Sequence, residues 1–431
     1  MQYISDLHLH SRFSRATSKS LNLANLEKYG RLKGLNLLGT GDFMHPEWQK
    51  ELKSELTDEG SGISKTKSGY LFVLSNEISL MYRQDGKGRR AHVVLLAPNM
   101  DVVDQITDYF KGFGRVDYDG RPIFGKSIIE VTEGLKKISD AIEVIPAHIW
   151  TPWFGLLGSK SGFDSFKQAL GDQAKHIYSF ETGLSSDPEM NWRVSELDKY
   201  TILSFSDAHS HWPWRIGREA TILDLKDLTY KDLIRAIRTR EGYKGTIEVD
   251  PGYGRYHHDG HRACGVSLSP TVSKQYGGIC PVCKRPLTLG VMYRIEELAD
   301  RPEGYTPKNA AQIYKLVPLS DLISIRHQKG VATKTVWEVY NQLIAQFKSE
   351  YEILLNASAS ELGKVVDPKL VELILLNRQG KIEVKPGYDG VYGEVVSASD
   401  SKPEVSSTLE TPKTMEQLKT IEKPQKNLLE Y

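Results

Sequence analysis

The sequence has very little cysteine and no long apolar run. Three cysteines in 431 residues cannot build a disulfide framework, and two of them form a Cys-x-x-Cys pair, which in a thiol-poor chain indicates a metal site. No apolar stretch approaches the ~20 residues of a membrane-spanning helix. The segment from Met1 to Phe13 lacks the basic start and apolar middle of a signal peptide. We therefore expect a cytoplasmic protein with no membrane partner.

An excess of charge of one sign is also missing. The chain has 56 Lys and Arg residues against 55 Asp and Glu residues, a formal charge of +1. Such a balance neither attracts nor repels a polyanion over the whole surface, so binding to nucleic acid would need local basic patches. The chain does have length and 39% hydrophobic residues. These predict a globular protein of about three domains with a large core.

The first part of the chain, 1–225, alternates short β-rich apolar runs with longer helix-like stretches. This alternation predicts a parallel α/β sheet or barrel. A Gly- and Asp-rich stretch at 110–125 has no periodicity, and we expect it to be a loop at the mouth of this domain. The runs expected to form strands are 2–6, 35–39, 70–75, 91–97, 142–146, 176–180 and 201–206.

Three further regions follow the first. Residues 245–300 are rich in Gly, Pro, Tyr, His and Cys and too poor in aliphatic side chains for a core of their own. Residues 305–395 carry apolar residues at helical spacing, which predicts a small helical domain. Residues 397–431 are a mixture of Ser, Thr, Pro, Lys and Glu, which predicts disorder.

Two distant segments, 245–254 and 380–390, have similar sequences. Each has a short β-rich run that leads into Pro-Gly-Tyr. One interpretation is a pair of similar hairpins with no shared role, because turn chemistry recurs by itself. The other is a matched pair of contacts to an extended ligand.

Histidines and carboxylates follow the ends of the expected strands. Asp6, His8 and His10 alternate at one strand end and so share one side, and Asp207 and His209 repeat the arrangement after the last run. Because the carboxyl ends of barrel strands share one face, we expect a cluster of divalent metal ions there. The remaining residues expected in this cluster are Asp42, Glu77, His92, His148 and Glu181.

Some of these residues need a further argument. His92 begins its run, but the turn signal at Asp85-Gly86 would return the strand antiparallel and place His92 beside Glu77. Asp42 and Glu181 could instead cap helices, as acidic residues after strands often do.

Clustered metal ions lower the pKa of a bound water and neutralise a phosphate, so no nucleophilic side chain is required. We expect His8, Glu77 and Asp207 to be the catalytic residues, with Glu77 bridging two ions.

Cationic and aromatic side chains near these motifs are candidate contacts to a phosphate-bearing substrate. Arginines clamp phosphates, whereas tryptophans either stack on bases or pack the barrel mouth. The candidate residues are Arg12, Arg215, Arg218, Trp150, Trp153 and Trp214.

The region 245–300, which we call the zinc-binding unit, has the spacing of a structural zinc site. All three cysteines, Cys264, Cys280 and Cys283, lie there. A His-x-x-Cys pair, fifteen intervening residues and the Cys-x-x-Cys pair match a closed tetrahedral zinc site, which would replace the missing core. His261 fits the spacing best as the fourth ligand, and His257 and His258 are alternatives.

Nine of the strand-end residues, all those named above except Asp6, resemble the metal site of the PHP (polymerase and histidinol phosphatase) superfamily. This resemblance implies a distorted seven-stranded β/α barrel with up to three divalent ions, such as zinc, manganese or magnesium, and phosphoester hydrolysis. The family often has another ligand histidine soon after its first motif, and residues 11–20 contain none. The expected architecture is therefore α/β, with the barrel followed by a zinc-binding unit and a small helical domain.

Further motifs resemble the endonuclease Q family over residues 1–393. They are Tyr-His-His-Asp-Gly-His-Arg-Ala-Cys at 256–264, Cys-Pro-Val-Cys-Lys-Arg-Pro-Leu-Thr at 280–288, Glu-Leu-Ala-Asp-Arg-Pro-Glu-Gly-Tyr at 297–305 and Pro-Gly-Tyr-Asp-Gly at 386–390. The resemblance implies cleavage of DNA on the 5′ side of deaminated bases (hypoxanthine, uracil, xanthine) or abasic sites. Ser267 stands where some relatives have a cysteine, which favours His261 as the zinc ligand.

Two other function classes compete with this interpretation. One is a PHP phosphatase acting on a small phosphomonoester, which would have little use for the appended units. The other is a non-catalytic DNA-binding module tethered to a clamp, in which the metals are structural. Gln425, Leu428 and Tyr431 resemble the motif that docks on the PCNA sliding clamp, although a chance match in a polar tail is the alternative.

Overall fold

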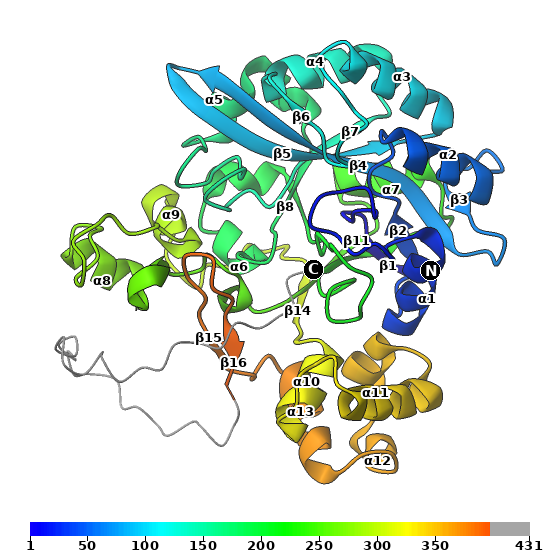
Figure 1. Cartoon of the computed structure of the whole chain (residues 1–431), viewed down its shortest axis with the longest axis vertical. Helices are drawn as coiled ribbons and strands as arrows, with labels where there is room; N and C mark the ends of the chain where they lie inside the picture. The colour runs from blue at the N-terminus through cyan, green and yellow to red at the C-terminus, as the bar shows by residue number, and fades with distance from the viewer. Residues whose placement is uncertain (397–431) are drawn as a thin grey trace.

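The computed structural model describes residues 1–396. Its main element is a ten-stranded mixed sheet that curls into a half-barrel, with the order β14-β11-β10-β1-β2-β4-β5-β7 and with β3 and β6 also paired to β4 (Figure 1). The strands of this sheet are β1 (Gln2–Asp6), β2 (Leu37–Gly39), β3 (Ser64–Lys65), β4 (Leu71–Gln84), β5 (Lys87–Ala97), β6 (Ile123–Phe124), β7 (Glu143–Pro146), β10 (Ala220–Asp224), β11 (Tyr243–Glu248) and β14 (Gln312–Lys315). A separate parallel pair consists of β8 (Ser179–Glu181) and β9 (Thr201–Leu203).

Each of the seven runs expected from the sequence contains a strand, but the predicted seven-stranded barrel is not exact. The strands β10, β11 and β14 extend the sheet beyond β1, and β10 lies antiparallel to β1. The long strands β4 and β5 are antiparallel because Asp85 and Gly86 both have positive φ angles, 52° and 74°, which is the geometry of a tight hairpin turn. Only part of the sheet, including β1, β2 and β4, is parallel.

Helices cover the sheet, and most of them start at a residue whose side chain caps the helix. Ser127 and Glu130 form a reciprocal capping box at the start of α4, and Val131 and Leu135 of this helix are buried. One core cluster joins strand residues such as Val94 to Leu233 of α7. The helices of this part are α1 (Leu23–Lys33), α2 (Pro46–Glu55), α3 (Met100–Lys111), α4 (Ile128–Ile138), α5 (Phe166–Leu170), α6 (Pro188–Asn191) and α7 (Tyr230–Thr239), with short turns η1 (Gly171–His176) and η2 (Ser195–Lys199).

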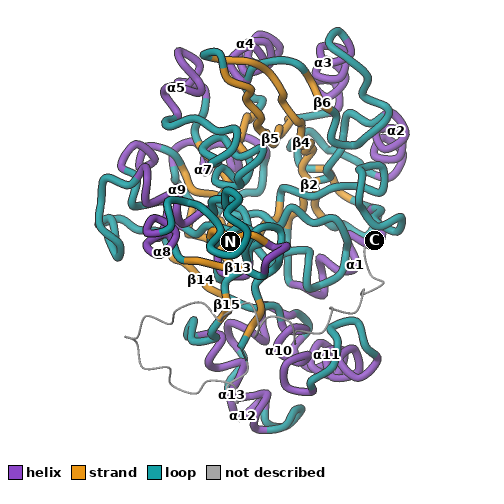
Figure 2. Tube along the Cα trace, turned by 60° about the vertical axis from the view of Figure 1, so that its left-hand side comes forward, coloured by secondary structure: helices purple, strands orange, loops and turns teal. Residues whose placement is uncertain are grey.

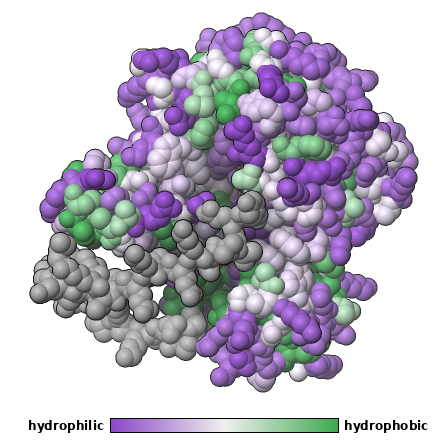
Figure 3. All heavy atoms as spheres, in the orientation of Figure 1, coloured by the Kyte–Doolittle hydropathy of each residue, from purple (hydrophilic) through white to green (hydrophobic). Residues whose placement is uncertain are grey.

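The zinc-binding unit projects from one side of the sheet. Its buried apolar cluster contains only Val266, Cys280 and Leu287, which is too small to hold the unit together by itself. Figure 3 shows hydrophobic residues gathered on this lobe, on a face that is otherwise mainly hydrophilic, and Val272 and Val282 are exposed there. The elements are η3 (Pro251–Tyr253), β12 (Asp259–His261), η4 (Arg262–Cys264), β13 (Val266–Leu268), α8 (Pro270–Gln275) and α9 (Val291–Leu298).

A helical lobe lies below the sheet in both Figures 1 and 2. It consists of α10 (Leu319–His327), α11 (Lys334–Phe347), η5 (Glu352–Asn356), α12 (Ala359–Leu362) and α13 (Pro368–Arg378). A buried ion pair between Lys33 of α1 and Glu350 ties the lobe to the sheet. After α13, the short strands β15 (Val384–Lys385) and β16 (Glu394–Val395) form an antiparallel hairpin.

The described residues bear on the expected absence of a membrane-spanning helix, but not on the expectations for the C-terminal tail. No helix in residues 1–396 is both long and apolar enough to cross a bilayer. The expected disorder at 397–431 and the clamp-binding residues Gln425, Leu428 and Tyr431 lie outside the described residues.

Candidate metal centre

The strand ends meet at a cavity of about 670 Å³ that is lined by His92, His148, Asp207 and His209. His8 and His10 follow β1, Glu77 lies within β4 and His92 within β5. His148 follows β7, Glu181 ends β8, and Asp207 and His209 follow β9. The sheet therefore brings side chains that are up to 201 residues apart to one place, as the strand-end pattern predicts.

Four side chains form a first group that could hold a metal ion. The ligand atoms of His8, His10, Glu77 and Asp207 all lie within 4.8 Å of one another. His10 Nε2 is 3.0 Å from Asp207 Oδ1 and 3.3 Å from Glu77 Oε2. His8 Nε2 is 3.5 Å from the same Glu77 oxygen. Imidazole nitrogen and carboxylate oxygen are ligands for zinc and manganese alike.

A second group shares Glu77 with the first. Glu77 Oε1 lies 2.7 Å from His92 Nδ1 and 3.2 Å from His148 Nε2. Each oxygen of Glu77 therefore faces one of the two groups, which is the arrangement that a bridging carboxylate requires. The antiparallel pairing of β4 and β5 brings His92 beside Glu77, as the turn signal at Asp85-Gly86 predicts.

Asp42 and Glu181 lie behind the histidines and in neither group. Glu181 Oε2 is 2.8 Å from His8 Nδ1, and Asp42 Oδ1 is 3.3 Å from His10 Nδ1. Each carboxylate thus contacts the ring nitrogen opposite the one that faces Glu77, and so fixes the orientation of the imidazole. Asp42 is itself held by Ser11, whose backbone N–H and hydroxyl both donate to Oδ2 at 2.6 Å.

Two residues of the strand-end pattern take other positions. Asp6 does not face the cavity beside His8 and His10, because its carboxylate accepts hydrogen bonds from Ser206 and from Gly217 N. The ring of His209 lies 4.5 Å from that of His10, and its Nδ1 is 2.9 Å from the backbone carbonyl of Asp207. His209 therefore borders the first group at the cavity.

Burial and charge act in opposite directions on these groups. Burial lowers the pKa of His8, but Glu181, Glu77 and Asp207 outweigh it and hold the pKa well above its usual value. Burial would raise the pKa of Glu77, but His92, Arg121 and His8 hold it well below its usual value. The carboxylates therefore attract positive charge strongly. Burial lowers the pKa of His92 to about 4, which keeps this imidazole neutral, the form that binds metals.

In the described part of the chain, two buried histidine nitrogens at the site lack a hydrogen-bond partner, as expected where a cation would bind. His8 Nε2 and His92 Nε2 are buried and have no hydrogen-bond partner within residues 1–396. A buried polar atom without a partner is costly. His8 Nε2 faces Glu77 Oε2 at 3.5 Å, and a metal ion held by the first group would give this nitrogen a partner. The donor set of histidines and carboxylates fits divalent ions such as zinc or manganese.

Three of the site residues have a strained backbone. Asp42, His148 and Asp207 have φ angles of 48°, 30° and 47°, in the left-handed region that residues other than glycine seldom adopt. Such a conformation costs roughly 1–3 kcal/mol for each residue and persists only where the surroundings enforce it. All three follow strand ends, so the strain turns their side chains toward or behind the cavity.

Arg121 was not expected from the sequence. Its Nη1 lies 3.1 Å from Glu77 Oε2, and the side chain lines the cavity. Arg121 belongs to the stretch 110–125, which was expected to form a loop at the mouth of the domain. That expected position is the one feature of the sequence that places Arg121 near the cavity. Its charge raises the electrostatic attraction of the cavity for anions.

The structure separates the candidate DNA contacts into two sets. Trp153, Arg215 and Arg218 line the cavity. Trp150 does not, because its ring is 1% exposed and its Nε1–H donates to Asn191 Oδ1 at 2.7 Å, so it is a core residue and cannot stack on a base. Trp214 stacks on Trp212 outside the cavity lining. Arg12 pairs with Glu51 at a different hollow.

In the zinc-binding unit, the structure brings together His261, Cys264, Cys280 and Cys283. Their ligand atoms lie within 4.8 Å of one another, and His261 Nδ1 is 3.2 Å from Cys283 Sγ. Neither His257 nor His258 belongs to this group. Among the three histidines considered from the sequence, His261 is therefore the one positioned as the fourth ligand.

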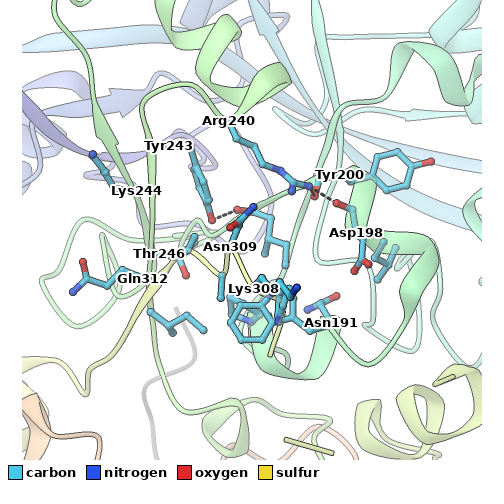
Figure 4. A pocket seen from close by; sticks show the side chains of 18 residues that line it. Asn191, Asp198, Tyr200, Arg240, Tyr243, Lys244, Thr246, Lys308, Asn309 and Gln312 are labelled. Atoms are coloured by element: carbon cyan, nitrogen blue, oxygen red, sulfur yellow. Dashed lines mark hydrogen bonds between the residues drawn. The ribbon is translucent and has the colours of Figure 1, made fainter. Parts of the chain in front are cut away.

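A second cavity of about 650 Å³ lies beside the amino ends of β9, β11 and β14 (Figure 4). Arg240 points to Asp198 and Tyr200 and donates to both of their backbone carbonyls. None of the metal-binding groups found within residues 1–396 lies in this cavity. The candidate reactive site is therefore the cavity at the carboxyl ends of the strands.

Comparisons with known proteins identify relatives of this chain. A family model described as the MJ0043 C-terminal domain matches residues 318–381. The uncharacterized protein MJ0043 of Methanocaldococcus jannaschii is 34% identical over 253 residues, which cover 58% of this chain and 31% of that protein. The chain thus aligns with less than a third of that relative.

Two solved structures match almost the whole chain. The lesion-specific endonuclease PfuEndoQ from Pyrococcus furiosus is 31% identical with a TM-score of 0.82, covering 92% of this chain and 95% of that chain. Endonuclease Q in complex with a 27-mer duplex substrate with an abasic lesion at the active site is 31% identical with a TM-score of 0.83, covering 94% and 99%. Because these matches extend over nearly the full length of both chains, this protein belongs to the endonuclease Q family.

Proposed function

We propose that this chain is a metal-dependent DNA endonuclease that hydrolyses the phosphodiester bond on the 5′ side of a deaminated base (hypoxanthine, uracil or xanthine) or an abasic site, and so initiates DNA repair. The observation that carries the proposal is Glu77, whose two oxygens face two groups of histidines beside a cavity that arginines line. The family supports an endonuclease, and one of its members binds a duplex with an abasic lesion at the active site.

In this proposal, His8, His10, Glu77 and Asp207 hold one ion and Glu77, His92 and His148 hold another. Divalent ions bound there would lower the pKa of a water and neutralise phosphate oxygens. Glu181 and Asp42 fix the ring orientations of His8 and His10 from behind. Arg121 beside Glu77 adds a positive charge for the phosphate.

The other parts would support this centre. Residues 1–225 would carry the metal centre, the zinc-binding unit would be closed by one zinc at His261, Cys264, Cys280 and Cys283, and 305–395 would form the helical domain.

Gln425, Leu428 and Tyr431 would dock on the PCNA clamp, a proposal that rests on the sequence alone. Deleting 425–431 should leave nicking by the enzyme alone unchanged and abolish any stimulation by PCNA.

The test of the activity uses an end-labelled duplex that contains one deoxyinosine, deoxyuridine or abasic site. We expect a single cut on the 5′ side of the lesion that leaves a 3′-hydroxyl for a polymerase, and no cut with chelator. A sequencing gel maps the position. A cut on the 3′ side, or turnover of small phosphomonoesters alone, would contradict the proposal.

Matched variants separate the metal centre from general damage to the protein. His8→Ala and Asp207→Asn should each lower cleavage by more than about 100-fold, beyond the usual effect of changing a group behind a ligand. His176→Ala and Asp172→Asn are the controls, because both residues lie in η1, away from the cavity lining. Circular dichroism should show the same fold in all four variants.

A further inference from the structure

The two similar segments noted in the sequence pack against each other. Gly387 N donates to Gly252 O at 2.8 Å, and Gly393 N donates to Tyr253 O at 3.2 Å. A Cβ on Gly387 would lie 2.3 Å from Gly254 O, and one on Gly393 would lie 2.0 Å from Gly252 O. The glycines therefore permit a close backbone approach between the segment 245–254 and the hairpin that follows 380.

This contact fixes the hairpin of β15 and β16 on the rest of the molecule. The hairpin runs from the helical lobe toward the zinc-binding unit, where Tyr388 bridges to His258 (Figure 1). The Arg255 guanidinium also donates to Gly390 O at 2.9 Å. As a result, Tyr392 of the hairpin reaches the cavity that holds the metal centre.

Three arginines surround Tyr392 at this edge of the cavity. The Cζ atoms of Arg255 and Arg215 lie 5.0 Å and 5.5 Å from the centre of the Tyr392 ring. Burial raises the pKa of Tyr392, but the charges of Arg218, Arg215 and Arg255 outweigh it and bring the pKa below its usual value. The edge of the cavity is therefore strongly positive.

The guanidinium of Arg218 is fixed by two hydrogen bonds, and one of its nitrogens has no partner among the described residues. Its side chain is 6% exposed, and its Nε and Nη2 both donate to Ser206 O. Nη1 is buried and has no hydrogen-bond partner within residues 1–396. In that same part of the chain, no carboxylate oxygen lies within 4.0 Å of the guanidinium of Arg215, Arg218 or Arg255. Asp321 and Glu219 act electrostatically on Arg215 and Arg218 from beyond this distance, so the three cations have only remote counter-charges. An anion bound between the guanidinium groups would supply a close one.

The chemistry of this cluster selects a phosphate. Guanidinium groups donate paired hydrogen bonds to phosphate oxygens, and a tyrosine hydroxyl adds a further donor. The cluster lines the same cavity as His92, His148 and Asp207, so its ligand would lie beside the metal centre.

We propose that Arg215, Arg218, Arg255 and Tyr392 form a subsite for a DNA backbone phosphate that neighbours the one being cut, and that the C-terminal hairpin completes this subsite. This inference rests on the proposed function. Arg215 and Arg218 were candidate contacts from the sequence. Arg255 follows the first of the two similar segments, and Tyr392 reaches the subsite through the contact of the hairpin with that segment.

The test measures binding of a fluorescent duplex with an abasic analogue by anisotropy, over a range of salt concentrations. All proteins carry Asp207→Asn so that the duplex stays intact. Arg255→Ala should weaken binding by about tenfold and reduce the slope of log K against log salt by about 0.9, the change for one lost phosphate contact. Tyr392→Phe should weaken binding to a smaller extent, because it removes a neutral donor.

Two controls make the result specific. Arg235→Ala removes an exposed arginine of α7 that does not line the cavity, and should change neither the affinity nor the salt slope. Gly393→Ala displaces the hairpin and should reproduce the loss seen with Arg255→Ala, whereas Gly330→Ala, where a Cβ has room, should not.

The outcomes are distinguishable from failure of the proposed function. If the protein without Asp207→Asn cuts the lesion duplex but Arg255→Ala binds with the affinity and slope of Arg235→Ala, the subsite is refuted and the endonuclease stands. Weaker binding at every salt concentration with an unchanged slope would also refute it, because it would indicate a structural role. If no lesion duplex is cut, the proposed function fails in the cleavage assay.

Discussion

Removing one partner of the buried pair between Lys33 and Glu350 should destabilise the protein strongly. The Lys33 side chain is 1% exposed, and its Nζ donates to Glu350 Oε1 at 2.7 Å and to Pro213 O at 2.8 Å. Glu350 is fully buried and also accepts from Leu319 N and from the Tyr340 hydroxyl, each at 3.0 Å. The pair therefore joins α1, the loop that leads to Arg215 and Arg218, and the helical lobe.

The size of the loss in unfolding free energy follows from the burial of both side chains. Lys33→Met leaves the Glu350 carboxylate buried without its counter-charge, which costs roughly 3–5 kcal/mol of unfolding free energy. Glu350→Gln leaves the ammonium group in the same position and should cost a similar amount. The double variant contains no unpaired buried charge, so its cost should fall short of the sum of the single costs by at least about 2 kcal/mol.

Urea unfolding followed by tryptophan fluorescence measures all four proteins of this cycle. The matched control is the same cycle at Lys137 and Glu133, whose side chains are 73% and 51% exposed, where the coupling should stay below about 1 kcal/mol. If the single costs at Lys33 and Glu350 add to within about 0.5 kcal/mol in the double variant, the reasoning is wrong.

Three further predictions concern other parts of the molecule. Cys280→Ser should remove one bound metal, measured by mass spectrometry, and make residues 259–291 sensitive to limited proteolysis, because the unit has almost no core of its own; an unchanged metal content would contradict this. Asp321→Asn should stabilise the protein at pH 8 by about 3 kcal/mol, because burial raises the pKa of this carboxyl from 3.8 to about 6. The folded protein holds the Asp321 proton more tightly than the unfolded chain does, so the advantage of the variant should shrink as the pH falls from 6 and vanish below 3.8; urea midpoints at several pH values check the sign. Trp150→Phe should cost roughly 1–3 kcal/mol of stability, because it leaves the buried Asn191 Oδ1 without a donor, and it should leave the affinity for DNA unchanged; urea unfolding and anisotropy can measure both.

The strand-end pattern predicted the residues that meet at the cavity because it follows from topology. The carboxyl ends of neighbouring parallel strands share one edge of a sheet, and a short turn returns β5 along β4. His8, Glu77, His92 and Asp207 could therefore be placed together without any knowledge of packing. The number of strands could not, because β10, β11 and β14 join the sheet through pairing that local sequence does not specify.

The remaining errors and omissions have a common cause, which is long-range docking. Arg255 and Tyr392 meet only because two segments more than a hundred residues apart pack together, and no periodicity reports such a contact. The burial of Trp150 likewise depends on Asn191 of α6. For Asp42 and Glu181, the sequence predicts that each lies near the metal centre. It does not predict which histidine nitrogen each carboxylate contacts.

The pairing of β4 with β5 makes the metal centre a check on how the chain has folded. Glu77 stands opposite Val94 and His92 stands opposite Ser79, so Glu77 and His92 are diagonal neighbours on one face of the hairpin. If the hairpin closed with one strand shifted by a single residue, the two side chains would point to opposite faces. A misaligned molecule would then lose either Glu77 or His92 from the ligand set. Metal uptake during refolding in excess of the one ion of the zinc-binding unit should therefore report the fraction of molecules whose β4–β5 hairpin has closed correctly, before any DNA is cut.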